Sequence, residues 1–390
     1  QNNKNRHARI IQYLIPCSFH SIPLFLLRFS DSKMISRTNY LFVLISYWLL
    51  LNLNYLSPIV ALAQEGTSTT TADDATTATS TTCVNDDALT KIRIGLEWFI
   101  NPDHLPLVVA KKHGFFREFG LDVELVEPES HWEAEEEILA GRLDIAVTEP
   151  LHLSQDASKG KPVLGFSRFL HTDGGVMYKK NTGIMRPSDM CGKTISYPGS
   201  PGKGGPAIVN TMVKADGKMD CDLESYGKYN GGFYHNDALE SGKADLATLI
   251  FWNFEIPEAR SKGMDVDFFS LKDWGVPDFC QLVLFTTPEN FTKKRDILRK
   301  VVLAMRRATG IIHQQPALAA SYFNDYTASS PTSTPKEVMD ATLPAFPNDN
   351  SISREYFERL MAWLVETEQV DAEAASKTPV GTYWTNEIAW

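Results

Sequence analysis

One stretch near the start of the folded part decides the fold: Gly95–Pro128, which reads GLEWFINPDHLPLVVAKKHGFFREFGLDVELVEP. Apolar and polar residues alternate in KIRIGLEW and in LDVELVEP, and this alternation predicts two strands. The segment between them, HLPLVVAKKHGFFREFG, has helical spacing, with Gly114 as its expected C-cap. The turn after the first strand carries Trp98, Asn101 and His104. Such a turn is either a ligand site or a helix start with an aromatic side chain packed nearby.

The alternation of strands and helices continues along the chain in two blocks. Each block predicts a parallel, doubly wound sheet. We expect an α/β protein with two doubly wound lobes around a ligand cleft, one lobe from 89–172 and 275–390 and the other from 173–274. A helix is predicted over 292–323, and further helices over 335–375 are expected to follow as C-terminal additions.

Unusual polar and aromatic residues gather where the predicted strands end. The stretches VTEPLH, YPGSPGKGG and IFWNFE occupy such positions, as does the turn that carries Trp98. Ligands of α/β sheets bind at the carboxyl ends of the strands, in the crevice between lobes. This convergence favours a ligand site. The candidate ligand-binding residues are Trp98, Asn101, His104, Glu149, His152, Tyr197, Ser200, Gly202, Gly204, Gly205, Trp252, Asn253 and Glu255.

The main candidates also have structural interpretations, which the sequence leaves open. The structural alternative for Trp98 is a buried core residue, and the alternative for His104 is a helix cap. His152 is otherwise a satisfied polar residue, and Glu255 the partner of Arg260. The stretch GSPGKGG is otherwise a surface turn.

Composition and motifs exclude several functional classes. The 390-residue chain carries a formal charge of −10 at pH 7, which argues against nucleic acid as a partner because phosphate binding requires a basic face. GSPGKGG lacks the P-loop pattern, and neither G-x-S-x-G nor C-x-x-C occurs. The cleft strands carry no metal-ligand cluster and no pair of catalytic carboxylates. We therefore expect no catalytic residue, no metal and no cofactor.

The N-terminal part is not expected to belong to the fold. Residues 1–33 precede the first methionine, Met34, and are interpreted as a non-native upstream extension. Residues 34–63 combine an arginine, a long apolar run and an A-x-A site, which predicts a secretory signal peptide. A signal anchor in the membrane is the alternative. Residues 64–88 are rich in Thr, Ser and Ala and predict a disordered linker, so the folded part is expected to be secreted or extracytoplasmic.

The cysteines and one glycosylation sequon are relevant to the expected secreted location. Of the five cysteines, Cys17 lies outside the expected mature chain, and the remaining even number agrees with disulfide formation in a secreted protein. We favour a Cys191–Cys221 pair because both residues flank one segment, although four cysteines allow three pairings. Asn290 begins the sequon N-F-T and is a glycosylation candidate in a secreted chain.

Several stretches resemble a known family. GLEWFINPDHLPLVVAKKHGFF with GLDVELVEP, GRLDIAVTEPLHL and LIFWNFEIPEA are similar to the thiamine-pyrimidine family, over roughly residues 91–330. That family includes bacterial binding proteins for formyl-aminopyrimidine and the yeast enzyme that makes the thiamine pyrimidine. The wider group includes sulfonate- and nitrate-binding receptors. The resemblance implies a type II periplasmic-binding-protein fold.

The resemblance also implies roles for the candidate residues. Trp98 would stack on an aromatic ring, and Asn101 and His104 would line the mouth of the cleft. Glu255 would accept hydrogen bonds from an aminopyrimidine, whose ring edge carries N–H donors. GSPGKGG would present backbone N–H groups to an anion or a carbonyl oxygen. The implied protein is a monomer with a small pyrimidine-like ligand and a membrane transporter as a candidate partner.

Departures from the yeast enzyme favour a binding protein over a synthase. That enzyme consumes an active-site histidine, and His152 stands at the matching place. Its lysine for pyridoxal phosphate corresponds to Thr148, which cannot form a Schiff base, and its cysteine-rich iron motif is reduced to Cys280. Two alternatives stay open: an enzyme of pyrimidine biosynthesis that uses His152, and a sulfonate- or nitrate-type anion-binding protein of the same fold.

Overall fold

The computed structural model describes residues 89–129, 134–197, 204–329 and 334–390, all within one compact unit of the chain. The predicted upstream extension, signal peptide and linker lie outside the described residues, and so do Ser200 and Gly202 of the predicted site. Within the described part, no helix combines the length and the apolar character that a bilayer-spanning segment requires.

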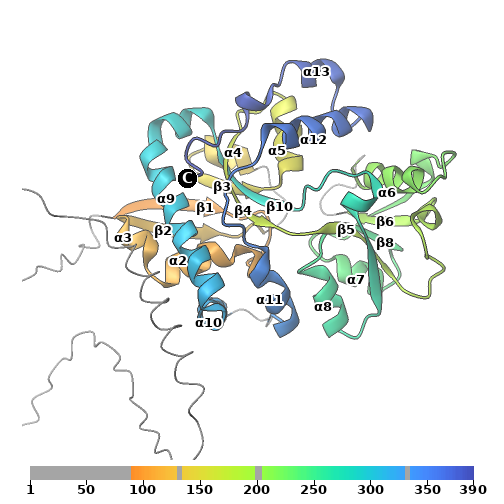
Figure 1. Cartoon of the computed structure of the whole chain (residues 1–390), viewed down its shortest axis with the longest axis horizontal. Coiled ribbons are helices and arrows are strands. Elements are labelled where there is room, and N and C mark those ends of the chain that lie inside the picture. Colours follow the sequence, from red (N-terminus) through yellow and green to blue (C-terminus); the bar gives the residue numbers. More distant parts are fainter. Residues whose placement is uncertain (1–88, 130–133, 198–203, 330–333) are drawn as a thin grey trace, which may run out of the picture. The chain divides into compact units, whose positions relative to one another are not determined.

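Two five-stranded sheets organise this part of the chain (Figure 1). The first has the strand order β2-β1-β3-β10-β4 and the second the order β7-β6-β8-β5-β9. The first sheet contains β1 (Thr90–Gly95), β2 (Leu121–Val126), β3 (Ile145–Thr148), β4 (Leu164–His171) and β10 (Gln281–Thr286). The second contains β5 (Gly174–Lys179), β6 (Thr194–Tyr197), β7 (Gly227–Asn230), β8 (Leu246–Phe251) and β9 (Val266–Ser270). The chain therefore leaves the first sheet after β4 and returns to it at β10.

Both sheets are mixed, so the expectation of parallel sheets was wrong for one strand in each. β1 is parallel to β2 and β3, and β6 is parallel to β7 and β8. β10 and β5 run antiparallel to both of their neighbours. Each enters its sheet directly from the other sheet, β5 after Thr172 and Asp173, and β10 after the 3-10 helix η6 (Leu271–Trp274) and a short loop. Neither crossing contains an α-helix.

Burial explains the alternation seen in the sequence. In β2, Leu121 and Val123 are buried while Asp122 and Glu124 are exposed, as in a strand covered on one face. β8 and β10 are buried at every residue, as expected for strands inside a covered sheet. The helices beside the first sheet are α2 (Leu105–Lys112), α3 (Phe115–Glu118), α4 (Ala134–Leu139), α5 (Pro150–Ser158), α9 (Pro288–Gln314) and α10 (Pro316–Tyr326).

The helix expected over 292–323 is interrupted. α9 ends at Gln314 and α10 begins at Pro316. Proline has no backbone N–H to continue the helical ladder, and its fixed φ suits a first helical position. α2 packs against both helices, which explains why Leu105, Leu107 and most of its other residues are buried.

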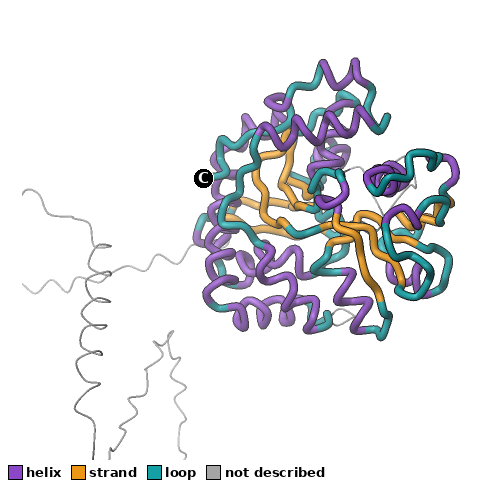
Figure 2. The backbone as a smooth tube through the Cα atoms, turned by 45° about the vertical axis from the view of Figure 1, so that its right-hand side comes forward, coloured by secondary structure: helices purple, strands orange, loops and turns teal. Residues whose placement is uncertain are grey.

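Helices flank the strands of the described part (Figure 2), and those not yet named lie beside the second sheet or follow it in the chain. Those of the second sheet are α6 (Gly204–Ala215), α7 (His235–Glu240) and α8 (Glu255–Ser261), and the C-terminal ones are α11 (Lys336–Thr342), α12 (Arg354–Glu366) and α13 (Ala372–Ser376). Further 3-10 helices are η3 (Pro102–His104), η4 (Pro187–Met190), η5 (Leu223–Ser225), η7 (Leu343–Ala345) and η8 (Val380–Thr382). α11 packs on α8, which follows β8 of the second sheet, and on η3, which follows β1 of the first sheet.

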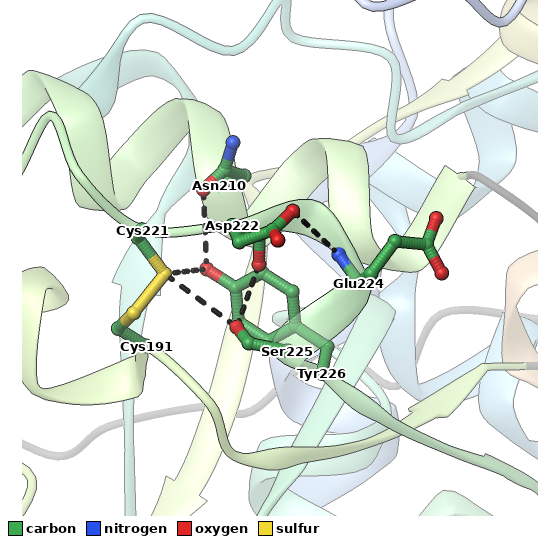
Figure 3. Close-up of a disulfide and its surroundings, with 7 residues drawn as sticks. All are labelled: Cys191, Asn210, Cys221, Asp222, Glu224, Ser225 and Tyr226. Atoms are coloured by element: carbon green, nitrogen blue, oxygen red, sulfur yellow. Dashed lines mark hydrogen bonds between the residues drawn. A yellow bond between two sulfur atoms is a disulfide. The ribbon is translucent and has the colours of Figure 1, made fainter.

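The predicted Cys191–Cys221 disulfide is present, with the two Cα atoms 5.9 Å apart (Figure 3). Cys191 follows η4, and Cys221 precedes η5. The Tyr226 hydroxyl lies 3.2 Å from the Cys221 sulfur and also donates to Asn210 Oδ1 at 3.4 Å. Cys280 is a buried free thiol. The bond therefore ties together two connecting segments beside α6.

Candidate ligand-binding site

A cavity of about 160 Å³ lies where strand ends of both sheets come together. The first sheet contributes the β1–α2 turn, α4, the end of β3 with α5, and one residue of β10; the second contributes the end of β8 and the start of α8. The lining residues are Glu97, Trp98, Asn101, Asp103, Ala134, Glu135, Val147, Thr148, Glu149, His152, Gln155, Asp156, Lys159, Leu249, Phe251, Glu255 and Phe285. Of the predicted site residues, the cavity brings together Trp98, Asn101, Glu149, His152 and Glu255.

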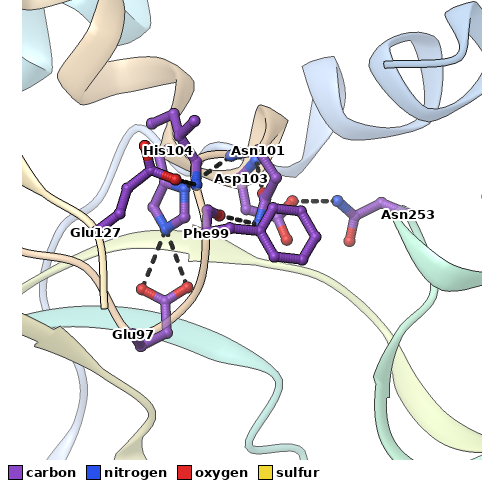
Figure 4. A network of polar contacts seen from close by, with 8 residues as sticks. Glu97, Phe99, Asn101, Asp103, His104, Glu127 and Asn253 are labelled. Atoms are coloured by element: carbon purple, nitrogen blue, oxygen red, sulfur yellow. Dashed lines mark hydrogen bonds and ion pairs between the residues drawn. The ribbon is translucent and has the colours of Figure 1, made fainter. Parts of the chain in front are cut away.

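The β1–α2 turn is held by its own hydrogen bonds (Figure 4). Asn101 Oδ1 accepts the backbone N–H of Asp103 at 2.8 Å, which caps η3. The Asn101 backbone N–H donates to His104 Nδ1 at 3.2 Å, and His104 Nε2 lies 3.0 Å from Glu97 Oε1. His104 is fully buried and is not part of the cavity lining. His104 therefore links the turn to Glu97 through hydrogen bonds on both ring nitrogens.

Trp98 lies between the cavity and aromatic residues of the β7–α7 segment. Its ring centroid is 4.3 Å from that of Phe233, and it stacks near His235 at 6.3 Å with an interplanar angle of 19°. The neighbouring Phe99 stacks on Tyr234 at 6.3 Å. Trp98 Nε1 is buried and has no hydrogen-bond partner among the described residues. The indole therefore offers the cavity an aromatic surface.

Asp103 is joined to the second sheet through a buried amide. Asn253 follows β8, and its Nδ2 donates to Asp103 Oδ1 and, at 2.8 Å, to Thr342 Oγ1 of α11. Asp103 is only 5% exposed, and Asn253 is fully buried without lining the cavity. Burial raises the pKa of Asp103 to about 7, although the Asn253 hydrogen bond and the nearby His104 act to lower it. The carboxyl is thus largely uncharged below neutral pH.

Glu255 is the acid that the second sheet places in the cavity. It begins α8, is 8% exposed, and its Oε2 accepts the Phe251 backbone N–H at 2.8 Å. Burial raises the pKa of Glu255 to about 8; the hydrogen bond from Phe251 lowers it, and the charge of Asp103 raises it further. The alternative partner, Arg260, donates instead to the Val266 carbonyl at 3.3 Å. Glu255 therefore faces the cavity as a buried carboxyl group.

The β3–α5 connection supplies a charged side of the cavity. His152 Nδ1 lies 2.6 Å from Glu149 Oε2, one helical turn apart on α5. Burial lowers the pKa of His152, but the charge and hydrogen bond of Glu149, together with the charge of Asp156, raise it, and the net shift is upward. Asp156 and Lys159 continue the same side of α5 and are 3.3 Å apart. Thr148, which also lines the cavity, carries no amine for a Schiff base.

Besides His104 and Asn253, four predicted site residues lie outside the cavity lining. Tyr197 is buried, and burial raises its pKa. Gly204 and Gly205 begin α6 against Tyr197; a Cβ on Gly204 would lie 2.7 Å from the Tyr197 hydroxyl oxygen. Trp252 is 38% exposed. The glycosylation candidate Asn290 is half-buried in the first turn of α9, where its backbone N–H donates to Thr287 Oγ1.

Sequence reasoning missed several lining residues, above all Asp103 and Leu249. Asp103 stands between Asn101 and His104, both of which were selected, so its position in the turn was an available signal. Leu249 has a left-handed backbone, φ 58°, beside an irregularity in the pairing of β8 with β5. A leucine in that conformation is strained, and no local sequence signal marks it.

Comparison with known proteins adds four findings. The family model described as NMT1/THI5 like matches residues 101–319. The formylaminopyrimidine-binding protein of Halalkalibacterium halodurans is 27% identical over 292 residues, covering 73% of this chain and 87% of the relative. The 4-amino-5-hydroxymethyl-2-methylpyrimidine phosphate synthase of Aspergillus parasiticus is 24% identical over 278 residues, 68% of this chain and 80% of the relative.

The fourth finding is structural. The alkanesulfonate-binding protein SsuA from Xanthomonas axonopodis pv. citri matches with a TM-score of 0.59 and 15% identity, covering 75% of this chain and 98% of that structure. At this identity the likeness shows the fold alone. The fold is that of the periplasmic binding proteins, with additional C-terminal helices, as the sequence predicted.

Proposed function

We propose, from the premise that this chain belongs to the NMT1/THI5-like family, that it is a solute-binding protein for a thiamine-related pyrimidine or a similar small heteroaromatic. The observation that carries the proposal is the cavity itself. It combines the indole of Trp98 with the buried carboxyls of Glu255 and Asp103. An aromatic surface with acceptors at its edge matches a flat ring that carries N–H donors.

The size of the cavity supports a single-ring ligand. Its volume is about 160 Å³, close to the roughly 150 Å³ of an apolar cavity known to hold benzene. A six-membered ring with small substituents fits this space. Unlike that dry cavity, this one is lined by carboxyl, imidazole and amide groups, which select for a polar ring.

The charge of the lining argues against the anion-binding alternative. Six carboxyl-bearing residues line the cavity, and Lys159 is the single lysine or arginine among the lining residues that the structure describes. A sulfonate or nitrate ion needs an excess of donors or positive charge. Buried carboxyl groups such as Glu255 would oppose it.

The proposed setting is extracytoplasmic. The predicted signal peptide at 34–63 and the Cys191–Cys221 disulfide both agree with an oxidising compartment. In this setting the protein would be a monomer that delivers its ligand to a membrane transporter. The relatives include a binding protein, and the structural neighbours include periplasmic ligand-binding components.

The second candidate function is an enzyme of pyrimidine synthesis, favoured by the 2.6 Å contact between His152 and Glu149 in the cavity and by the relatives named as synthases. Thr148 argues against it because a threonine cannot hold pyridoxal phosphate as an imine. Incubation with pyridoxal phosphate should give no imine absorbance. A stable imine together with the loss of His152 from a peptide map would establish the enzyme instead.

A thermal-shift screen followed by calorimetric titration tests the binding function. The panel contains aminopyrimidines, aliphatic sulfonates, nitrate and amino acids. An aminopyrimidine at a hundred times its Kd should stabilise the protein by about 2.7 kcal/mol, because ligand that binds only the folded state adds to its stability. Stabilisation by a sulfonate alone, or by no ring compound, would refute the proposal.

A further inference from the structure

We propose that the ligand is bound as a cation, with a positive charge on its ring that is balanced by Asp103 and Glu255. This inference rests on the proposed function and adds the chemical class of the ligand. It starts from a difference among the carboxyl groups of the cavity: most already have a cationic partner in the protein, and these two do not.

The paired carboxylates all belong to the first-sheet side. Glu97 contacts His104 at 3.0 Å and Glu149 contacts His152 at 2.6 Å. Asp156 lies 3.3 Å from Lys159, and Glu135 is paired with Lys161. These contacts supply a basic side chain to each carboxylate, so none of the four requires a charge from the ligand.

Asp103 and Glu255 differ from those four. Across the described ranges of the chain, neither forms an ion pair with a lysine, an arginine or a histidine. Asp103 receives an amide N–H from Asn253, and Glu255 receives the backbone N–H of Phe251. Both are more than nine-tenths buried, and they come from opposite sheets to line one cavity. A cation between them would find two carboxyls that lack a charged partner.

The hydrogen bonds of Asn253 fix which of its side-chain atoms contacts Asp103. The Thr342 hydroxyl donates its hydrogen to the Val338 carbonyl at 2.8 Å, so the Asn253 atom 2.8 Å from Thr342 Oγ1 must be the donor Nδ2. That leaves Asn253 Oδ1 buried with no partner among the described residues. Figure 4 shows both the amide oxygen and the second carboxyl oxygen of Asp103 on the same side of the Nδ2 contact. The amide therefore places a buried acceptor without a partner on the side chain that contacts Asp103.

The pKa values agree with this geometry. Burial raises the pKa of Asp103 to about 7 and that of Glu255 to about 8. The groups that face Asp103 are His104 and Glu97 from its own turn and Asn253 from the second sheet; Glu255 faces Asp103 and Glu258. Around neutral pH, Glu255 is therefore largely protonated and Asp103 is protonated in part.

Ligand entry then moves one proton. A neutral base takes it from a carboxyl group: the O–H bond breaks, an N–H bond forms on a ring nitrogen, and a carboxylate remains beside a ring cation. The second carboxyl keeps its proton. A permanently charged ring instead releases the displaced proton to solvent, so its binding must strengthen as pH rises, by up to about tenfold per pH unit for one proton.

Three ring probes separate the possibilities: 4-aminopyrimidine as a base, N-methyl-4-aminopyridinium as a permanent cation, and aniline as a ring of similar size without a ring nitrogen. Titration calorimetry in two buffers of different ionisation enthalpy counts the protons exchanged between pH 6 and pH 9. We expect the permanent cation to bind more tightly at high pH with proton release, and aniline to bind at least about tenfold more weakly than 4-aminopyrimidine.

Variants assign the proton. The variant that removes the donating acid, either Asp103→Asn or Glu255→Gln, should reduce the proton release, whereas Asp340→Asn, an exposed partner of Lys336 on α11, should leave it unchanged. The pH dependence of the unaltered protein is itself a test that needs no variant to fold. If aniline binds as tightly as 4-aminopyrimidine and no probe exchanges protons, the inference is wrong while the binding function stands. If no ring compound binds at any pH, both are refuted.

Discussion

The first sheet contributes five of the six carboxyl-bearing residues of the cavity, whereas the second contributes Glu255 beside the apolar Leu249 and Phe251. Four of the first-sheet carboxylates are ion-paired, and their partners fix them before any ligand arrives. The second-sheet side is held by backbone instead, through the Phe251 N–H and the strained β8 end. The comparison teaches that the first-sheet wall has an ion-pair partner for each of its carboxylates except Asp103, whereas the single acid of the second-sheet wall, Glu255, has none among the described residues.

The largest expected effect is on the second wall. Glu255→Gln should weaken aminopyrimidine binding by about 2–4 kcal/mol, since a charged hydrogen-bonding group is lost from a buried site. The amide oxygen would take the Phe251 N–H, which leaves the NH₂ group facing a donor edge of the ring. Titration calorimetry should show a Kd on the order of a hundredfold higher. A change within about threefold would mean that another group reads the ring edge.

Trp98 tests the first wall, where the expected loss is smaller. Trp98→Ala removes the aromatic surface and should cost about 2 kcal/mol of binding energy. Trp98→Phe is the matched control because it keeps a ring but removes Nε1, and should lose less. If the phenylalanine and alanine variants bind equally weakly, the indole N–H rather than stacking is the contribution of Trp98.

The pH dependence of stability compares the acids of the two walls directly. The folded-state pKa values of Asp103 and Glu255 lie above their ordinary values of 3.8 and 4.5. Their stabilising effect is therefore present at low pH and is lost as pH rises through about 7 and 8 respectively. Each can contribute a slope of up to about 1.4 kcal/mol per pH unit. Urea unfolding between pH 5 and 8 should show that the free energy of unfolding declines less steeply with pH in Asp103→Asn than in the unaltered protein. An unchanged slope would contradict a raised pKa of Asp103.

The smallest effect concerns the strained end of β8. Leu249 has φ 58°, which glycine adopts freely and alanine does not. Leu249→Gly should therefore be more stable than Leu249→Ala by about 1 kcal/mol, although both lose the leucine side chain. Parallel thermal melts measure the difference. Equal stabilities would show that the local backbone relaxes once the side chain is removed.

Much of the fold could be predicted because its signals are local. The alternation around Leu121 and the turn that contains Asn101 indicate a strand and a capped helix start from neighbouring residues alone. The directions of β5 and β10 could not be obtained this way, because they depend on how the chain crosses between sheets. Strand direction follows from the connection rather than from the pattern inside the strand.

The candidate site shows the same division. Trp98 and Glu255 stand in conspicuous motifs and line the cavity. Asp103 takes its place in the site from Asn253, which is 150 positions away in the sequence, and His104 turns away from the cavity to contact Glu97. Contacts of this kind determine whether a polar residue of a turn lines the cavity or stabilises the turn itself.

The Cys191–Cys221 bond has a consequence for chain cleavage. It closes a covalent ring that contains β6 and α6, both part of the second sheet and its helices. A protease that cuts once inside this ring leaves two fragments joined through sulfur. Nicked protein would therefore migrate as one species until a thiol reductant is added, and the fragments of the second sheet could not diffuse apart.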